Sequence, residues 1–212
     1  FIDKQDAYFE EYARTYTDMP MLVVLDKHKR SYVGGRFVRA ADFDNSLGED
    51  NNPDWKTVVI DEKTGDIIAP NGSIGFRWGE EGKWNLVSKK GRRNTKPRLS
   101  LIFDKDDTVD VLFPDFQTGI DVPMKRKVPV KKVTLNGKEV FVATVFDMQL
   151  AQYGLDRGLG GTAAKGYDDA KVPNTPAWAE KITGVKQADI IRSGREFADN
   201  ASKTMGKSMV IL

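Results

Sequence analysis

The chain opens with apolar residues at helical spacing. Phe9, Tyr12, Ala13 and Tyr16 fall at positions i, i+3, i+4 and i+7, which places their side chains on one face of a helix. The pattern predicts an amphipathic helix over residues 3–16.

Strand-like segments follow this helix. Residues 21–25 form an uninterrupted apolar run, and the charged residues 26–30 separate it from a second strand-like segment, residues 31–38. The pattern predicts a β-hairpin across the charged turn. The single histidine of the chain, His28, is expected to be exposed in that turn.

Residues 55–147 carry the pattern of short β-strands separated by turn residues. The strongest hairpin signal is Asn136-Gly137, because both residues accept the positive φ angles of a type I′ turn and both flanks alternate. The strands predicted in this stretch are residues 57–61, 66–70, 83–88, 99–103, 109–113, 128–135 and 139–146.

Helical spacing returns in the last third of the chain. A helix is predicted over residues 148–157 with Gly158 at its end, and residues 158–175 read as a loop rich in Gly, Ala and Asp.

Two more helices are expected after this loop. Thr175 provides an N-cap, Pro176 a first helical position and Gly184 the end of a short helix. A second helix begins near Lys186. Its expected buried side consists of Ile190, Ile191, Phe197, Ala198 and Ala201.

The last residues, 208–212, form an apolar run typical of a buried strand. In an α/β protein such a strand continues into a loop and a covering helix, because parallel strands need both faces buried. We therefore expect the chain to be an internal piece of a larger protein. Residues 209–212 are expected to lie parallel and next to residues 21–25.

Together these elements predict an α/β fold with α+β character. A mixed sheet is expected to be flanked by helices at the two chain ends, with a β-rich antiparallel insert in the middle. The predicted division assigns residues 1–54 and 148–212 to the α/β portion and residues 55–147 to the insert, as a separate antiparallel unit.

The amino-acid composition of the chain argues against several classes of function. The 212 residues carry a formal net charge of +2, which predicts no general affinity for nucleic acid or for an anionic membrane. The chain has no cysteine and one histidine, so it offers few side chains for thiol, hydrolytic or metal chemistry. The absence of cysteine also excludes a Cys-ligated cluster within these residues.

Three motifs resemble ligand sites, and we interpret each as structural. Residues 158–166 resemble a phosphate-binding glycine loop but follow a helix where that motif requires a strand. Residues 104–110 resemble the start of a calcium loop, but Val109 stands where the sharp turn needs glycine. Residues 89–98 form a basic run that reads as a solvated loop, with contact to an acidic partner as the alternative.

Residues 71–79, NGSIGFRWG, place large aromatic side chains on glycine-rich backbone. One interpretation is a loop packed on its own aromatic rings. The other is a contact surface, since Trp and Arg are the favoured interface anchors. The candidate interface or cleft-facing residues are Asn71, Phe76, Arg77 and Trp78.

Several short stretches, taken in order along the chain, carry a resemblance to one family. They are residues 16–23 (YTDMPMLV), 39–42 (RAAD), 51–57 (NNPDWKT), 69–79 (APNGSIGFRWG), 82–86 (GKWNL), 153–159 (YGLDRGL), 167–169 (YDD), 175–180 (TPAWAE), 182–185 (ITGV) and 195–200 (REFADN). These stretches resemble the alpha subunit of the membrane-associated respiratory nitrate reductases, which are molybdopterin oxidoreductases of the dimethyl-sulfoxide-reductase superfamily. Residues 88–132 match this family poorly.

The resemblance implies an enzyme that reduces nitrate to nitrite. Its alpha subunit would carry a molybdenum bis(molybdopterin guanine dinucleotide) cofactor and one [4Fe–4S] cluster. Electrons would come from quinol through an iron–sulfur beta subunit and a haem-bearing membrane gamma subunit. The whole enzyme would sit on the cytoplasmic face of the cell membrane as a peripheral protein, whereas the fragment alone would be soluble.

The resemblance also implies that the chemistry lies outside these residues. The family's cluster ligands and its molybdenum-ligating aspartate would precede Phe1, so no catalytic, cofactor-binding or metal-binding residue is assigned and the isolated fragment is expected to be inactive. Two alternatives stay open: a fragment of another molybdopterin oxyanion reductase, acting on selenate or chlorate, and a non-catalytic binding module.

Overall fold

The computed structural model describes residues 7–50, 52–70, 95–102, 107–115, 119–204 and 206–210. The elements are α1 (Ala7–Tyr16), β1 (Leu22–His28), β2 (Ser31–Phe37), the 3₁₀ turns η1 (Ala40–Asp42) and η2 (Asp44–Gly48), β3 (Val59–Ile60), β4 (Ile67–Ile68), β5 (Thr108–Asp115), β6 (Gly119–Pro129), β7 (Lys131–Leu135), β8 (Lys138–Thr144), α2 (Val145–Gln152), α3 (Pro176–Thr183) and α4 (Gln187–Lys203).

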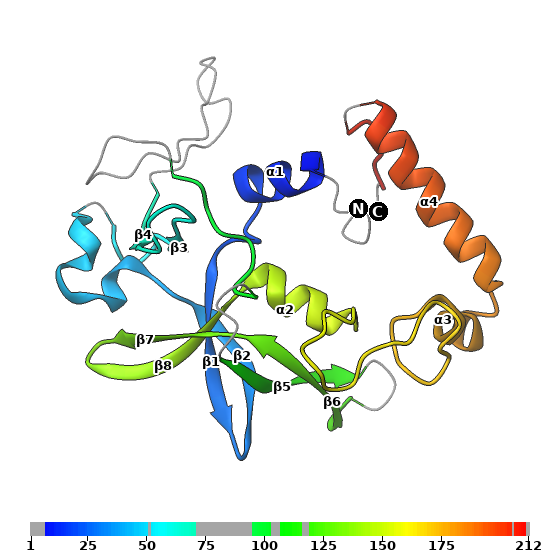
Figure 1. Ribbon diagram of the computed structural model, residues 1–212, viewed down its shortest axis with the longest axis horizontal. Coiled ribbons are helices and arrows are strands. Elements are labelled where there is room, and N and C mark those ends of the chain that lie inside the picture. The colour runs from blue at the N-terminus through cyan, green and yellow to red at the C-terminus, as the bar shows by residue number, and fades with distance from the viewer. Residues whose placement is uncertain are drawn as a thin grey trace.

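Six strands form one mixed sheet in the order β6-β5-β2-β1-β8-β7. β2 and β5 pair parallel, and the other neighbours pair antiparallel. β3 and β4 form a separate two-stranded hairpin. Figure 1 shows α2 along the sheet and α4 leading away from it. The predicted fold class, an α/β fold with a mixed sheet and flanking helices, is therefore confirmed.

Alternation along β1 sends its side chains to two core clusters, one on each face of the sheet. Leu22 and Val24 join the cluster that includes Ile60 and Leu101, which lie in the segments around the β3–β4 hairpin. Leu25 joins the cluster that includes Ala151 of α2 on the other face. A third cluster packs α1 on α2; its buried members are Ala13, Leu99, Phe146 and Leu150.

Local turn and cap predictions are confirmed. The β1–β2 hairpin and the β7–β8 hairpin form as expected, and Asn136 and Gly137 have φ angles of 48° and 74°. Thr175 Oγ1 accepts the backbone N–H of Trp178 at the start of α3, and Gly184 ends that helix with a left-handed φ of 72°.

The predicted C-terminal strand is wrong. Residues 207–210 form no strand in the described part, and Met209 and Val210 are 77% and 70% exposed. β1 pairs with β2 on one edge and β8 on the other, so neither edge is open to residues 209–212.

The prediction of a separate antiparallel unit over residues 55–147 is also wrong, because β5 to β8 share one sheet with β1 and β2. The β8 strand supplies the neighbour that β1 needs, and the parallel contact of the sheet is between β2 and β5. The assignment of residues 1–54 and 148–212 to a molybdopterin oxidoreductase domain stays a prediction.

Several element limits differ from expectation. Thr144 caps α2, so this helix starts at Val145 and ends at Gln152, and the glycine that follows its last turn is Gly154 and not Gly158. Residues 128–135 divide between β6 and β7, which pair with different strands. Residues 83–88 lie outside the described residues.

Two predictions about burial and strands also fail. Residues 99–102 form no strand, because the Leu101 N–H donates to a carboxylate of α2 and not to a neighbouring strand. α4 has no buried residue, and Phe197 on its apolar side is 44% exposed. The helical period shows which face is apolar but does not supply a surface to cover it.

None of the described helices is long and apolar enough to cross a membrane.

Candidate interaction site at the base of residues 71–94

The residues predicted to form a contact surface lie outside the described part of the chain. Asn71, Phe76, Arg77 and Trp78 all fall within residues 71–94. The structure describes the two flanks of this segment, residues 59–70 and 95–102, and shows how they are held.

Backbone hydrogen bonds join the two flanks to each other. The Arg98 N–H donates to the Ile60 carbonyl and the Glu62 N–H donates to the Lys96 carbonyl, both at 2.8 Å. The chain therefore returns after residue 94 to the same β3–β4 hairpin from which it departs before residue 71.

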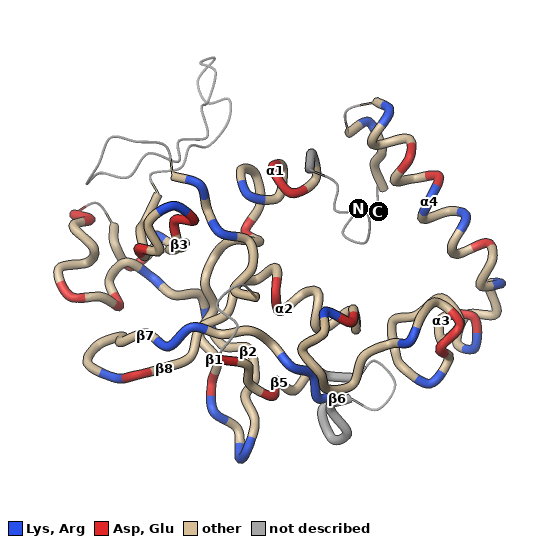
Figure 2. The backbone as a smooth tube through the Cα atoms, in the orientation of Figure 1, with Lys and Arg blue, Asp and Glu red and all other residues tan. Residues whose placement is uncertain are grey.

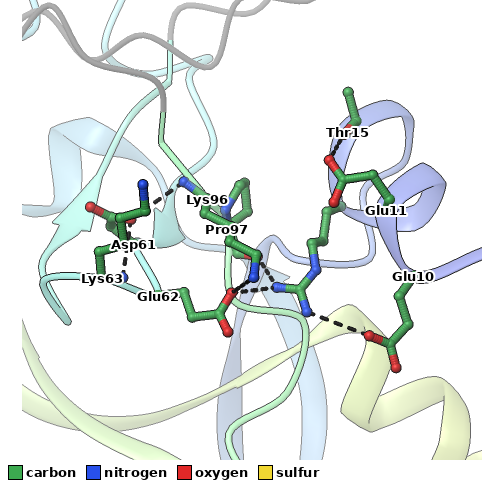
Figure 3. A network of polar contacts seen from close by, with 9 residues as sticks. Glu10, Glu11, Thr15, Asp61, Glu62, Lys63, Lys96 and Pro97 are labelled. Carbon is green, nitrogen blue, oxygen red and sulfur yellow. Dashed lines mark hydrogen bonds and ion pairs between the residues drawn. The ribbon is translucent and has the colours of Figure 1, made fainter. Parts of the chain in front are cut away.

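Charged side chains bind the two joined flanks, which together form the base of residues 71–94, to α1. Arg14 Nη1 donates to Glu62 Oε2 at 2.8 Å and to the Pro97 carbonyl at 2.9 Å, and Lys96 Nζ lies 3.0 Å from the same Glu62 oxygen. Figure 3 shows the Glu62 carboxylate facing the guanidinium that also reaches toward Glu10. One carboxylate thus links the hairpin, the returning segment and the first helix.

The electrostatics keep Glu62 ionised. Burial by itself raises the pKa of this carboxyl, but the hydrogen bond from Lys96 and the positive charge of Arg14 outweigh burial, so the pKa of Glu62 lies below its ordinary value. A carboxylate with such a pKa is an anchor and not a proton donor near neutral pH.

A second network supports the returning segment from inside. Asp147, in the first turn of α2, is fully buried and accepts the Ser100 hydroxyl at 2.7 Å, the Leu101 N–H at 2.8 Å and Arg157 Nη1 at 2.7 Å. Its own N–H donates to Thr144 Oγ1 at 3.0 Å. No pattern in the sequence predicts this network. The Thr144-x-x-Asp147 spacing of a helix cap could have identified Asp147 as a helix-start residue, though not its partners.

The arrangement joins residues 59–70, residues 95–102 and α1 into one base. In the described ranges no group of three or more His, Cys, Asp or Glu side chains could hold a metal ion. Figure 2 shows basic and acidic residues interspersed along the described backbone.

Hydrogen bonds of two backbone N–H groups in the glycine loop, residues 158–166, favour the structural interpretation over a phosphate-binding loop. Its backbone is held against β6 and the end of α2: the Thr162 N–H donates to the Lys125 carbonyl at 3.4 Å and the Ala164 N–H to the Gly154 carbonyl at 3.0 Å. These N–H groups already have protein acceptors, so they do not form an anion cradle.

The calcium-like stretch is described only in part, since residues 103–106 lie outside the described ranges. Asp110 lies on β5 between two lysines of β6, with Lys127 Nζ at 3.0 Å and Lys125 Nζ at 3.4 Å. The hydrogen bond from Lys127 lowers the pKa of Asp110. Its carboxylate is therefore neutralised by protein cations. Residues 108–110 belong to β5, so the predicted solvated turn is wrong for this part of the stretch.

His28 ends β1 and is exposed, as expected for the hairpin. It lines an open groove of about 880 Å³ between the β1–β2 hairpin, β5 and α2, together with Asp18, Met148 and Tyr153. The Tyr153 hydroxyl accepts Gln149 Nε2 at 3.1 Å. The groove was not predicted, because its walls come from segments far apart in the sequence.

Comparison with known proteins shows the class of protein to which this chain is similar. No family model matches the chain. From end to end, however, the chain is similar to a segment of nitrate reductase alpha chains, which confirms the resemblance predicted from the sequence.

The relatives come from several different organisms. The chain is 48% identical over 224 residues to the respiratory nitrate reductase 1 alpha chain of Escherichia coli and 40% identical over 214 residues to the nitrate reductase alpha chain of Bacillus subtilis. It is 41% identical over 223 residues to a nitrate reductase alpha subunit of Mycobacterium tuberculosis. Each match covers 100% of this chain but only 17–18% of the relative, so the chain spans less than a fifth of the length of these curated proteins.

Proposed function

We propose that this chain is a segment of the catalytic alpha subunit of a membrane-associated molybdenum nitrate reductase, which reduces nitrate to nitrite with electrons from quinol. The observation that carries the proposal is the 48% identity to a respiratory nitrate reductase alpha chain over the full length of this chain.

Within that enzyme the segment supplies a scaffold. The parent would carry molybdenum bis(molybdopterin guanine dinucleotide) and one [4Fe–4S] cluster, but this chain has no cysteine and its described residues present no metal-ligand group. Without a cysteine, this chain cannot ligate the [4Fe–4S] cluster through thiolates. We infer that the cluster ligands and the aspartate that would ligate molybdenum are supplied by other parts of the parent.

Exposed apolar side chains support a place inside a larger assembly. Trp55 is 80% exposed, Phe197 44% and Met209 77%. Apolar side chains of this size are more often covered in a finished protein or interface. The rest of the parent would cover them.

The parent's partners follow from the same proposal. We infer an iron–sulfur beta subunit and a haem-bearing membrane gamma subunit, nitrate as the small-molecule substrate, no nucleic acid, and a peripheral position on the cytoplasmic face of the membrane. The names of the relatives, which specify an alpha chain, support a multi-subunit enzyme.

The proposal is tested on the native protein that contains this chain. An antibody raised against the 212-residue chain isolates that protein from membranes of the source cells, and nitrate, selenate and chlorate reduction are measured with reduced viologen. We expect nitrate to be reduced by a protein that contains molybdenum and iron, while the isolated chain has neither activity nor stoichiometric metal. A native protein that reduces selenate or chlorate but not nitrate would favour the other oxyanion reductases. A native protein without molybdenum would favour the binding module.

We also propose that residues 71–79 face a partner subunit or the substrate cleft of the parent. The support is the fixed base that holds both flanks of this segment.

A Trp78→Ala substitution tests this placement. If Trp78 meets only a partner, the melting temperature of the isolated chain changes little, whereas subunit assembly or turnover of the full enzyme falls. If its ring belongs to the core of the chain, the substitution costs about 3–5 kcal/mol and the isolated chain melts early. Thermal unfolding of the isolated chain separates the two outcomes, and early melting would end the interface proposal.

A further inference from the structure

A buried arginine lies away from the base of residues 71–94. Arg126 belongs to β6, and its guanidinium reaches the loop after α2, where it meets the Thr162 carbonyl. Arg126 is 3% exposed, and it has no acidic partner within ion-pair distance among the described residues.

The guanidinium is only partly hydrogen-bonded. Its Nη1 donates to the Thr162 carbonyl, and its Nη2 lies 3.4 Å from the sulfur of Met124. The buried Nε–H has no acceptor in the described part of the protein. A guanidinium has five N–H donors, so most of its donor capacity is open.

The charge on this group persists despite burial. Desolvation lowers the pKa of Arg126, yet an arginine side chain does not give up its proton in a protein. A buried cation that stays charged is costly unless an anion lies close to it.

The neighbouring cations already have counter-charges. Lys127 pairs with Asp110 at 3.0 Å, and Arg157 pairs with Asp147 at 2.7 Å. Arg126 is therefore the cation of this group that lacks a carboxylate in the described structure.

A small cavity adjoins Arg126. Its volume is about 20 Å³, and its lining includes Lys127, Asp156, Arg157, Gly160 and Thr162. The Asp156 carboxylate accepts the Gly158 N–H at 2.9 Å and makes no ion pair with Arg126. A cavity needs at least about 10–15 Å³ to hold one water molecule. The cavity beside Arg126 therefore has room for one water-sized molecule or ion but not for an inserted side chain.

The backbone of the loop after α2 leaves room for the guanidinium itself. Gly154 has a left-handed φ of 75°, and a Cβ at this position would lie 2.7–2.9 Å from the guanidinium atoms of Arg126. Any larger residue would have to displace the buried guanidinium.

We propose that the cavity beside Arg126 binds one small monovalent inorganic anion about the size of chloride. The anion neutralises the guanidinium, accepts the open N–H donors and stabilises the packing of the loop on β6. This site does not depend on the proposed nitrate reductase function, because all of its residues belong to this chain.

Halide titration of the 212-residue chain tests the proposal. Sodium chloride or sodium bromide replaces sodium gluconate at constant ionic strength, and the melting temperature is measured for the wild type, for Arg126→Met and for Arg192→Met. At about tenfold excess over Kd, we expect the wild-type melting temperature to rise by roughly 3–6 °C. Arg192, an exposed residue of α4 that pairs with Asp189, provides the matched control and should leave the response intact.

Arg126→Met should fold, because an apolar replacement for a buried charge is often neutral, and it should lose the halide response. An equal response in the Arg126→Met variant, or none in the wild type, would overturn the proposal. Should the variant fail to fold, anomalous diffraction from wild-type crystals grown in bromide decides: a bromide peak within contact distance of the Arg126 guanidinium supports the site, and its absence rejects it.

Discussion

Asp147→Ala should lower the free energy of unfolding of this chain by about 3–5 kcal/mol, because it removes one partner of a buried ion pair and leaves the other without a counter-charge. Asp147 is fully buried, and the side chain of its partner Arg157 is only 16% exposed. The substitution also removes the acceptor of the Ser100 hydroxyl and of the Leu101 N–H. Urea unfolding followed by circular dichroism measures the change.

A double substitution separates the charge from the lost packing. Arg157→Met in the Asp147→Ala background removes the uncompensated cation, so the double variant should be more stable than Asp147→Ala alone. Asp189→Ala is the surface control, since Asp189 forms an exposed pair with Arg192 on α4 and such pairs contribute about 0–1 kcal/mol. An Asp147→Ala variant as stable as the surface control would contradict the proposed importance of the network.

The same network shows where sequence reasoning stops. Asn136-Gly137 and Thr175-Pro176 specify their turns within a few residues, so the turn and the cap could be predicted from local chemistry. Asp147 meets Ser100 across 46 intervening residues of sequence, and no local pattern identifies that partner. A segment predicted as a strand over residues 99–103 instead gives its backbone N–H to a side chain.

The errors about burial have a related cause. The spacing along α4 correctly indicates an apolar face, but burial depends on a second surface, and no residue of α4 is buried in the described structure. Likewise, the apolar run at residues 208–212 resembles a buried strand, yet β2 and β8 already occupy both edges of β1. The candidate contact residues Asn71, Phe76, Arg77 and Trp78 stay a prediction, because they lie outside the described residues.

A second polar centre, around Asp42, should make the stability of the chain depend on pH. Arg36 donates to both carboxylate oxygens, at 2.6 and 2.7 Å, and the Arg39 N–H donates at 2.8 Å. Burial by itself raises the pKa of Asp42, but the hydrogen bonds from Arg36 and Arg39 outweigh it, so the pKa of Asp42 lies below its ordinary value of 3.8. The folded state therefore binds the proton of Asp42 less readily than the unfolded state does.

The sign of the pH dependence follows from that difference. A carboxyl whose pKa is depressed by folding contributes its stabilisation fully above the ordinary pKa, and the contribution is lost as the pH falls through the folded-state pKa. Asp42→Asn should lower the free energy of unfolding at pH 7 by about 1–3 kcal/mol, because hydrogen bonds from a charged group are lost. The exposed side chain of Arg36 keeps the effect below that of Asp147→Ala.

The decisive measurement is the difference between wild type and Asp42→Asn as a function of pH. Urea unfolding at steps from pH 7 to about pH 3 should show the difference shrinking once the pH falls below about 4, since the wild-type carboxyl then begins to be protonated in the unfolded state. Asp44→Asn, at an exposed position of the next turn, should follow the wild-type curve. A difference that stays constant down to pH 3 would mean that Asp42 acts by shape alone and not through its charge.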